Sequence, residues 1–232
     1  MFKHYPADER GTSRTSWLNS RHSFSFGQYH DRERMGFRTL RVINDDVVEG
    51  GGGFGEHGHR DMEIISYVVE GGLEHRDSLG NGGVIRPGDV QLMSAGKGIR
   101  HAEFNASESE KVRFLQIWIP PSQAGIEAGY QQQKFPLADE PGRLHLLVDP
   151  DGRDGALKIH QDARLYGGRF RADDKTAVTI GDDRHAWVQI VRGSIDVNGH
   201  TLSEGDGAAI SDENELVFTD PKNAEVLLFD LA

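Results

Sequence analysis

Two pairs of potential metal-ligating side chains lie in the first half of the chain. His57 and His59 are separated by one residue, and His101 and Glu103 repeat this spacing farther along. Residues i and i+2 of a β-strand project from the same face, so each pair directs two donors toward one point. If the two strands are neighbours, three imidazoles and one carboxylate converge on one divalent metal ion. These donors suit iron, nickel, copper, manganese or zinc, and the sequence leaves the choice among them open.

The chain contains 11 histidines, and only three of them belong to these pairs. A glycine-rich turn precedes each pair, at residues 50–55 and 96–98, and the other eight histidines show no such pairing. We interpret the remaining histidines as structural or solvent-exposed, and they are His4, His22, His30, His75, His145, His160, His185 and His200.

Strands rather than helices are expected to position the two pairs. Short runs rich in β-branched and aromatic residues occur at 64–69, 113–119 and 187–191. Turns that contain glycine, proline or asparagine bound these runs at short intervals, which is typical of a β-sandwich or barrel. No long stretch has a helical period, although residues 123–134 could form one or two helical turns. We therefore predict an all-β protein with little helix.

The two halves of the chain share a pattern that indicates two related domains. In each half a strand reaches a glycine (Gly71 or Gly193), and a hairpin and a Gly-Asp turn follow. The stretch 120–142 is polar and interrupted by proline and glycine, so we expect a linker there. We predict an N-terminal metal-binding domain over residues 1–135, linker included, and a C-terminal domain over residues 136–232. The second half has no His-x-His pair, so we expect no metal site in it.

The composition narrows the class of protein. The 232 residues include 26 Lys plus Arg and 37 Asp plus Glu, a net charge of −11, and no basic run, which disfavours nucleic-acid binding. The absence of cysteine excludes disulfides and thiolate-bound metals. No apolar run reaches the ~20 residues that cross a bilayer, and residues 1–10 lack the apolar core of a signal peptide. We expect a cytoplasmic protein that binds neither nucleic acid nor membranes.

The motifs around both pairs resemble those of the cupin superfamily. Two cupin patterns, G-x5-H-x-H and one ending in G-x2-H-x3-N, are met by Gly51, His57 and His59 and by Gly98, His101 and Asn105. Longer stretches resemble the pirin family within the cupins, and they lie at residues 22–27, 35–46, 59–64 and 93–96. The resemblance implies a bicupin, which consists of two tandem β-barrel domains of the double-stranded β-helix or jelly-roll type.

The sequence is most similar to bacterial pirin-like proteins with quercetinase activity. This similarity implies a quercetin 2,3-dioxygenase-like oxidoreductase that cleaves the heterocyclic ring of a flavonol such as quercetin with O2 and releases carbon monoxide. It also implies that His57, His59, His101 and Glu103 bind the metal and that Glu103 is the catalytic base for the flavonol 3-hydroxyl. The general cupin pattern instead places its carboxylate ligand beside Glu63, which stays as the alternative.

A flat polyphenol would require an apolar, aromatic pocket. The candidates for its walls, each of which could equally belong to the core, are Phe24, Phe26, Phe54, Met62 and Phe114. Gln116 could point inward as a polar contact.

Two other functions are compatible with the sequence. Some eukaryotic pirins are metal-dependent partners of transcription factors, so a non-enzymatic regulatory partner protein is the alternative, although the acidity and the lack of a basic run argue against a nuclear role. A metal-stabilised barrel that binds a small metabolite without turnover is the third. We expect a monomer, because the two barrels can pack on each other.

Overall fold

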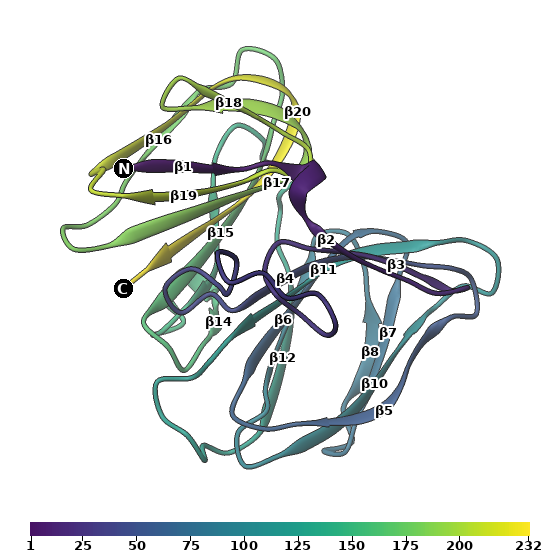
Figure 1. Cartoon of the computed structure of the whole chain (residues 1–232). Helices are drawn as coiled ribbons and strands as arrows, with labels where there is room; N and C mark the ends of the chain where they lie inside the picture. The colour runs from purple at the N-terminus through teal and green to yellow at the C-terminus, as the bar shows by residue number, and fades with distance from the viewer.

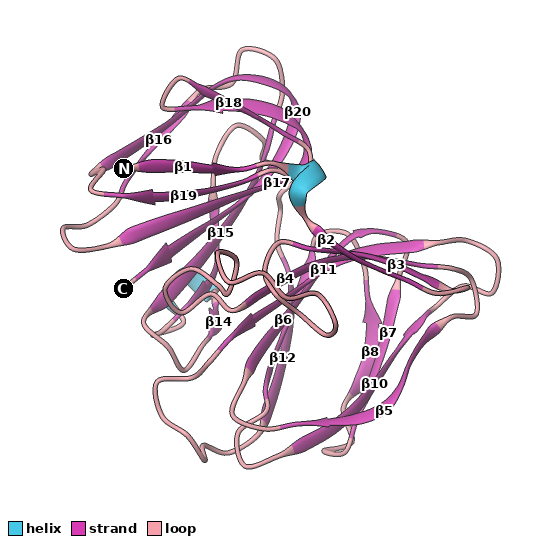
Figure 2. Ribbon diagram, in the orientation of Figure 1, coloured by secondary structure: helices cyan, strands magenta, loops and turns pink.

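The computed structural model describes residues 1–232 and contains two β-barrel domains that pack against each other (Figure 1). Nearly all regular structure is strand (Figure 2), and the helical content consists of two 3-10 turns, η1 at Ala7–Glu9 and η2 at Arg153–Gly155. The prediction of an all-β bicupin with little helix is confirmed. Neither helical turn has the length or the apolar character that a membrane crossing would need.

The N-terminal domain consists of two antiparallel sheets. Its strands are β2 (Gly11–Arg14), β3 (Leu18–His22), β4 (Val42–Val48), β5 (Gly53–His59), β6 (Glu63–Glu70), β7 (Leu73–Asp77), β8 (Gly82–Ile85), β9 (Asp89–Ser94), β10 (Ile99–Asn105), β11 (Val112–Ile119) and β12 (Gly129–Lys134). The larger sheet has the order β12-β9-β6-β11-β4-β3-β2, and the smaller has the order β5-β10-β7-β8. The small sheet faces the large one across the barrel interior (Figure 1). Side chains of both sheets meet there, as in the hydrogen bond from Ser66 to Glu103.

The alternation of buried and exposed residues explains which side chains face this interior. In β10 the odd-numbered residues from Ile99 to Asn105 are buried, and the residues between them are more exposed. This period of two is the signature of a strand with one face toward a core. It directs His101 and Glu103 to the same side, as the sequence predicts.

The C-terminal domain is built around two long strands. Its elements are β13 (His145–Asp149), β14 (Leu157–Lys158), β15 (Ala163–Phe170), β16 (Thr176–Thr179), β17 (His185–Val197), β18 (His200–Ser203), β19 (Gly207–Ser211) and β20 (Glu215–Leu231). The first strand of the chain, β1 (Phe2–Tyr5), pairs with β19 and therefore lies in the sheet of the other domain (Figure 1). The sequence pattern does not predict that β1 joins the C-terminal domain, because β1 and β19 lie at opposite ends of the chain.

Gly71 and Gly193 have equivalent conformations in the two halves. Both have a positive φ, 78° and 67° respectively. A Cβ at Gly71 would lie 2.7 Å from the carbonyl oxygen of Lys111, and one at Gly193 would lie 2.2 Å from that of Lys222. Only glycine combines this backbone conformation with such a close approach of a second strand. The repeated glycine is therefore a structural requirement in each half.

The two domains share one hydrophobic core. A cluster of 26 buried residues extends from the N-terminal sheet into the C-terminal one, and it includes Ile65, Tyr67 and Trp187. A polar contact also joins the two domains: the Tyr67 hydroxyl donates a 2.5 Å hydrogen bond to Glu225. One face of the large N-terminal sheet is thus covered by the C-terminal domain, which leaves its other face for the interior of the N-terminal barrel.

The prediction of helical turns over residues 123–134 is wrong. Residues Gly129–Lys134 form β12, which pairs with β9 at the edge of the large sheet. Part of the expected linker over 120–142 therefore belongs to the N-terminal domain. β12 can contain several glutamines because an edge strand is partly exposed to water. These polar residues made the segment resemble a linker in the sequence.

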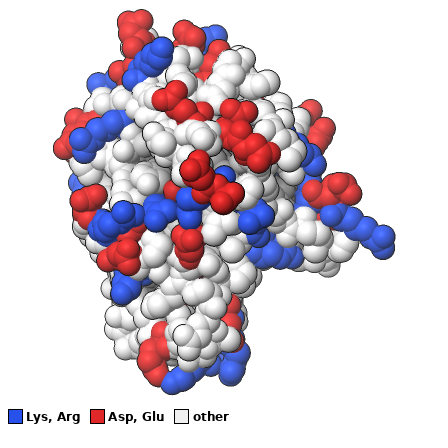
Figure 3. Space-filling view, turned by 90° about the vertical axis from the view of Figure 1, so that its left-hand side faces the viewer, with Lys and Arg blue, Asp and Glu red and all other residues white.

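Charged side chains of both signs are interspersed on the face of the molecule that Figure 3 displays. Several of them pair, and one network links the domains: Arg113 contacts Asp45 at 2.9 Å and Glu204 at 2.7 Å. Asp45 also accepts a hydrogen bond from Arg10 at 3.2 Å.

Candidate metal centre

The two predicted pairs lie on adjacent antiparallel strands. His101 of β10 is directly opposite His57 of β5, and Ile99 is opposite His59. A β-bulge follows His101, so that Glu103 is opposite Phe54. The Nε2 atoms of His57 and His101 are 3.1 Å apart. The register therefore gathers side chains that are far apart in the sequence.

His57, His59 and His101 form one group whose potential ligand atoms all lie within 4.8 Å of one another. His101 and Glu103 belong to a second group of this kind, together with His75. Nitrogen ligands at about 2.1 Å from a cation, at roughly right angles, are about 3 Å apart, which matches the separation of His57 and His101. The spacing of the donors thus fits a transition-metal ion.

The protonation of the imidazoles also fits a metal. His57 Nδ1 lies 2.8 Å from the Gly55 carbonyl oxygen and donates to it, so Nε2 keeps its lone pair and faces His101. The buried Nε2 of His59 has no hydrogen-bond partner. Burial, with a smaller effect of His57, lowers the pKa of His59 to about 4 and that of His101 to about 3. Both are therefore neutral at pH 7, the form that binds metals.

Glu103 is held by two hydrogen bonds inside the barrel. Ser66 donates to its Oε1 at 3.2 Å, and Gln116 Nε2 donates to its Oε2 at 2.7 Å. Trp118 Nε1 donates to Gln116 Oε1 at 3.2 Å, which fixes the orientation of the amide. Burial raises the pKa of Glu103, and the bond from Gln116 opposes this shift. The expectation that Gln116 points inward is confirmed.

Glu63 does not belong to the groups of potential metal ligands. Its Oε2 accepts hydrogen bonds from Ser94 at 2.9 Å and from the backbone of His160 at 3.3 Å. Glu63 and Ser66 differ by an odd number of positions along β6, so they face opposite sides of the sheet, and Ser66 is on the side of Glu103. Glu63 is therefore directed toward the C-terminal domain and away from the histidine group.

His75 belongs to the buried group that contains His101 and Glu103, although its sequence context indicated a structural or solvent-exposed residue. It lies opposite Glu103 on β7, is fully buried, and contacts Asp77 at 3.3 Å through Nε2. Its ring stacks on Tyr130, with centroids 4.9 Å apart. The His75-x-Asp77 spacing was a usable signal, because it places both residues on one face of a strand.

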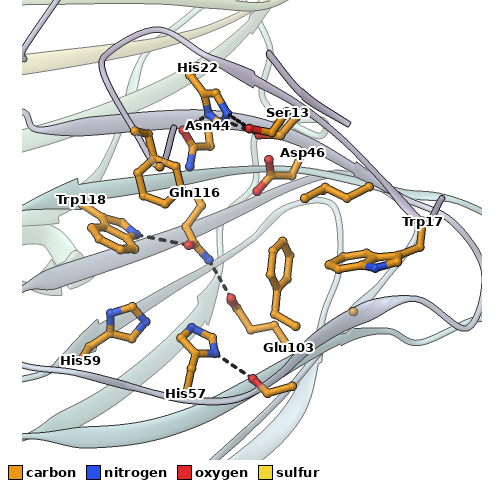
Figure 4. A pocket seen from close by; sticks show the side chains of 17 residues that line it. Ser13, Trp17, His22, Asn44, Asp46, His57, His59, Glu103, Gln116 and Trp118 are labelled. Carbon is orange, nitrogen blue, oxygen red and sulfur yellow. Dashed lines mark hydrogen bonds between the residues drawn. The ribbon is translucent and has the colours of Figure 1, made fainter. Parts of the chain in front are cut away.

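A cavity of about 500 Å³ opens beside the cluster (Figure 4). His57, His59 and Glu103 line one part of it. Two aromatic pairs form its sides: Trp17 meets Phe54 edge-on at 5.1 Å, and Phe26 meets Trp118 at 5.3 Å. Among the predicted wall residues, Phe26 and Phe54 line this cavity, and Met62 lines a neighbouring one. Phe24 and Phe114 belong to the hydrophobic core.

The far wall of the cavity is polar. It contains Ser13, His22, Asn44 and Asp46, which Figure 4 shows on the side opposite His57. No sequence pattern marks any of these four as a site residue. His22 lies on β3, and it reaches the cavity only because β3 pairs with β4 at the edge of the large sheet.

Comparison with known proteins places this architecture in a family. The pirin family model matches residues 5–119, and the model described as the quercetinase C-terminal cupin domain matches residues 146–231. A protein of Escherichia coli K12 named quercetin 2,3-dioxygenase is 47% identical over 97% of this chain and 96% of its own. The chain belongs to the pirin family. A pirin-like protein of Caulobacter vibrioides is 41% identical over the full length of both chains.

Solved pirin structures are similar throughout. A bacterial pirin from Escherichia coli in complex with nickel(II) is 46% identical, with a TM-score of 0.95 over 100% of this chain and 99% of that one. A quercetin 2,3-dioxygenase of Acinetobacter baumannii has a TM-score of 0.80 at 20% identity, over 98% of this chain and 85% of that one, which shows a shared fold. The His/Glu cluster and the nickel complex of a pirin relative support a single divalent metal ion in this cupin.

Proposed function

We propose that this protein is a metal-dependent dioxygenase that opens the heterocyclic ring of a flavonol such as quercetin with O2 and releases carbon monoxide. The observation that carries the proposal is a pair of potential ligand groups at the end of an aromatic-walled cavity. The two groups share His101, and one contains His57 and His59 while the other contains His75 and Glu103. The full-length similarity to proteins named quercetin 2,3-dioxygenase supports the same reaction.

His57, His59, His101 and Glu103 would hold the ion. A divalent cation there supplies Lewis-acid polarisation of a substrate oxygen and a site for dioxygen. Glu103 is favoured over Glu63 as the carboxylate, because Glu103 belongs to a potential ligand group and Glu63 is bonded to Ser94 and His160.

Glu103 would also accept the proton of the flavonol 3-hydroxyl. Each carboxylate oxygen has two lone pairs, so the bonds from Ser66 and Gln116 leave further acceptor positions. Burial raises the pKa of Glu103 in the metal-free protein, whereas a bound cation would favour the ionised carboxylate. Gln116, itself held by Trp118, keeps Glu103 in one orientation while the proton moves.

The aromatic pairs would position the substrate. Trp118 lies edge-on to His59 with centroids 5.0 Å apart, so the aromatic wall begins directly beside the cluster. A planar polyphenol can stack or meet these rings edge-on.

The test is carbon monoxide in the headspace. Protein purified without an affinity tag and loaded with nickel is incubated with quercetin under O2, and CO, quercetin and metal content are measured. We expect one CO for each quercetin consumed, and none from a His101→Ala variant. A metal-loaded parent protein that consumes no quercetin contradicts the proposal and favours the non-enzymatic regulatory partner instead.

A further inference from the structure

Asp45 and Asp46 are neighbours on β4, but only Asp45 is paired with arginines. The Asp46 carboxyl has a hydrogen-bond partner in Ser20, which lies opposite it on β3. The Asp45 carboxylate contacts Arg113 at 2.9 Å and Arg10 at 3.2 Å. Asp46 faces the other side of the sheet, is 4% exposed, and has an Oδ1 without any hydrogen-bond partner. Buried carboxylates normally have partners, because an unpaired one loses its hydration without compensation. Asp46 therefore has an unused capacity for hydrogen bonding.

Asp46 lines the cavity that the metal cluster shares. In Figure 4 it lies across from His57 and His59, and Ser20 of β3 separates it from Ser13 of β2. A ligand held at the cluster by one end would thus present its other end to this wall. Burial raises the pKa of Asp46 to about 7, with a smaller increase from Asp45.

The neighbouring polar groups also offer acceptors. His22 Nδ1 lies 2.7 Å from Asn44 Oδ1 and 2.8 Å separates its Nε2 from Ser13 Oγ. Asn44 Oδ1 can only accept, so His22 Nδ1 carries the proton and Nε2 accepts from the Ser13 hydroxyl. The lone pairs of Ser13 then stay available to a ligand. Burial lowers the pKa of His22, which agrees with this neutral tautomer.

Acceptors on the wall select a ligand that donates hydrogen bonds. A phenolic hydroxyl does so, and because it can also accept, it suits either protonation state of Asp46. A ligand carboxylate would meet the like charges of Asp46 and Glu103. The aromatic sides of the cavity favour a hydroxyl that is carried by a flat ring.

We propose that Asp46, with Ser13 two strands away on the same wall, forms a hydroxyl-binding subsite that selects flavonols with phenolic hydroxyls remote from the metal. The proposal rests on the proposed function, since it takes the flavonol 3-hydroxyl to lie at the cluster. It adds a preference for neutral polyhydroxylated substrates over acidic or unsubstituted ones.

The experiment measures binding rather than turnover. Nickel-loaded protein is titrated without oxygen against quercetin and against 3-hydroxyflavone, which has the metal-binding group but no other hydroxyl. Asp46→Ala removes the acceptor, Asp46→Asn keeps the shape of the side chain, and Asp173→Asn is the control, because Asp173 is exposed in a C-terminal loop.

The parent is expected to bind quercetin more tightly than 3-hydroxyflavone. Asp46→Ala should raise the Kd of quercetin about 10- to 100-fold, the range for a hydrogen bond to a charged group, and leave 3-hydroxyflavone unchanged. Asp46→Asn should raise the Kd of quercetin by a smaller factor. This variant provides the test if the alanine variant does not fold. If the substitutions weaken the binding of both flavonols equally, or of neither, the proposed subsite is overturned. A parent that binds both flavonols equally overturns the subsite alone, and one that binds neither overturns the proposed function as well.

Discussion

Gln116 Nε2 lies 2.7 Å from Glu103 Oε2, and these two side chains come from opposite sheets of the N-terminal barrel. The other end of the same amide accepts a hydrogen bond from Trp118. Gln116 thus connects the candidate metal ligand to the aromatic wall of the cavity, and the orientation of Glu103 depends on it.

Replacement of Gln116 by leucine should therefore impair turnover without removing the metal. Loss of a hydrogen bond that orients a ligand costs about 10- to 100-fold in activity or metal affinity. We expect kcat with quercetin to decrease in this range while metal analysis finds near-parental occupancy. Gln133→Leu on the exposed part of β12 is the control. An unchanged kcat in Gln116→Leu would show that Glu103 does not need this contact.

Substitutions of the two buried glutamates should have opposite effects. Glu103→Gln keeps the size of the side chain but removes its charge and basicity, so turnover should fall by about 10²–10⁴, the usual contribution of a general base. Glu63→Gln should keep turnover within about threefold of the parent, because its neighbours are Ser94 and His160 rather than the cluster. Rates are compared after division by metal content. A fast Glu103→Gln enzyme beside an inactive Glu63→Gln enzyme would transfer the catalytic role to Glu63.

Metal binding should raise thermal stability only when the histidine pair is intact. A ligand that binds the folded state at a concentration of about 100 Kd stabilises it by about 2.7 kcal/mol. We expect nickel to raise the Tm of the parent and of a His200→Ala control. Replacement of both His57 and His59 by alanine should abolish the shift and the bound metal. Retention of one equivalent of metal by the double variant would rule out this ligand set.

Asp46 should make the metal-free protein less stable as pH rises. Its folded pKa of about 7 is above the ordinary value of 3.8, so between these pH values the folded state binds more protons than the unfolded state. Stability that is present below pH 4 is therefore lost as pH approaches 7. Asparagine does not ionise, so the Asp46→Asn variant should not lose this stability as pH rises.

The comparison is made by urea unfolding at pH 5 and pH 8. Relative to the parent, Asp46→Asn should gain about 1–4 kcal/mol more at pH 8 than at pH 5, because one pKa unit corresponds to about 1.36 kcal/mol. The Asp173→Asn control should show no such difference. A gain of the same size at both pH values would mean that Asp46 is ionised throughout.

Local patterns predicted the cluster because β-strand geometry is local. The i, i+2 spacing places His57 with His59 and His101 with Glu103 on common faces, whatever else the chain does. The pairing of β5 with β10 could be expected from the repeated spacing. Residues without such a partner were missed, because only the long-range register brings them to the site.

His22 and Asp46 illustrate this limit. Each is a single polar residue in the sequence, and each lines the cavity because β3 and β4 are neighbours in the large sheet. The pairing of β1 with β19 is a more extreme case, since its partners are about as far apart as the chain permits. Edge strands such as β12 are also difficult to predict, because their polar composition resembles that of a linker.

Isotopic labelling tests the central claim most directly. If O2 adds across C2 and C4 of the flavonol, the carbon between them leaves as carbon monoxide with its own oxygen. Tag-free, nickel-loaded protein is incubated with quercetin under ¹⁸O₂, and the products are analysed by mass spectrometry. The account predicts two labelled oxygen atoms in the ring-opened product and unlabelled carbon monoxide. A ring-opened product with one labelled atom or none, or turnover without carbon monoxide, would contradict it.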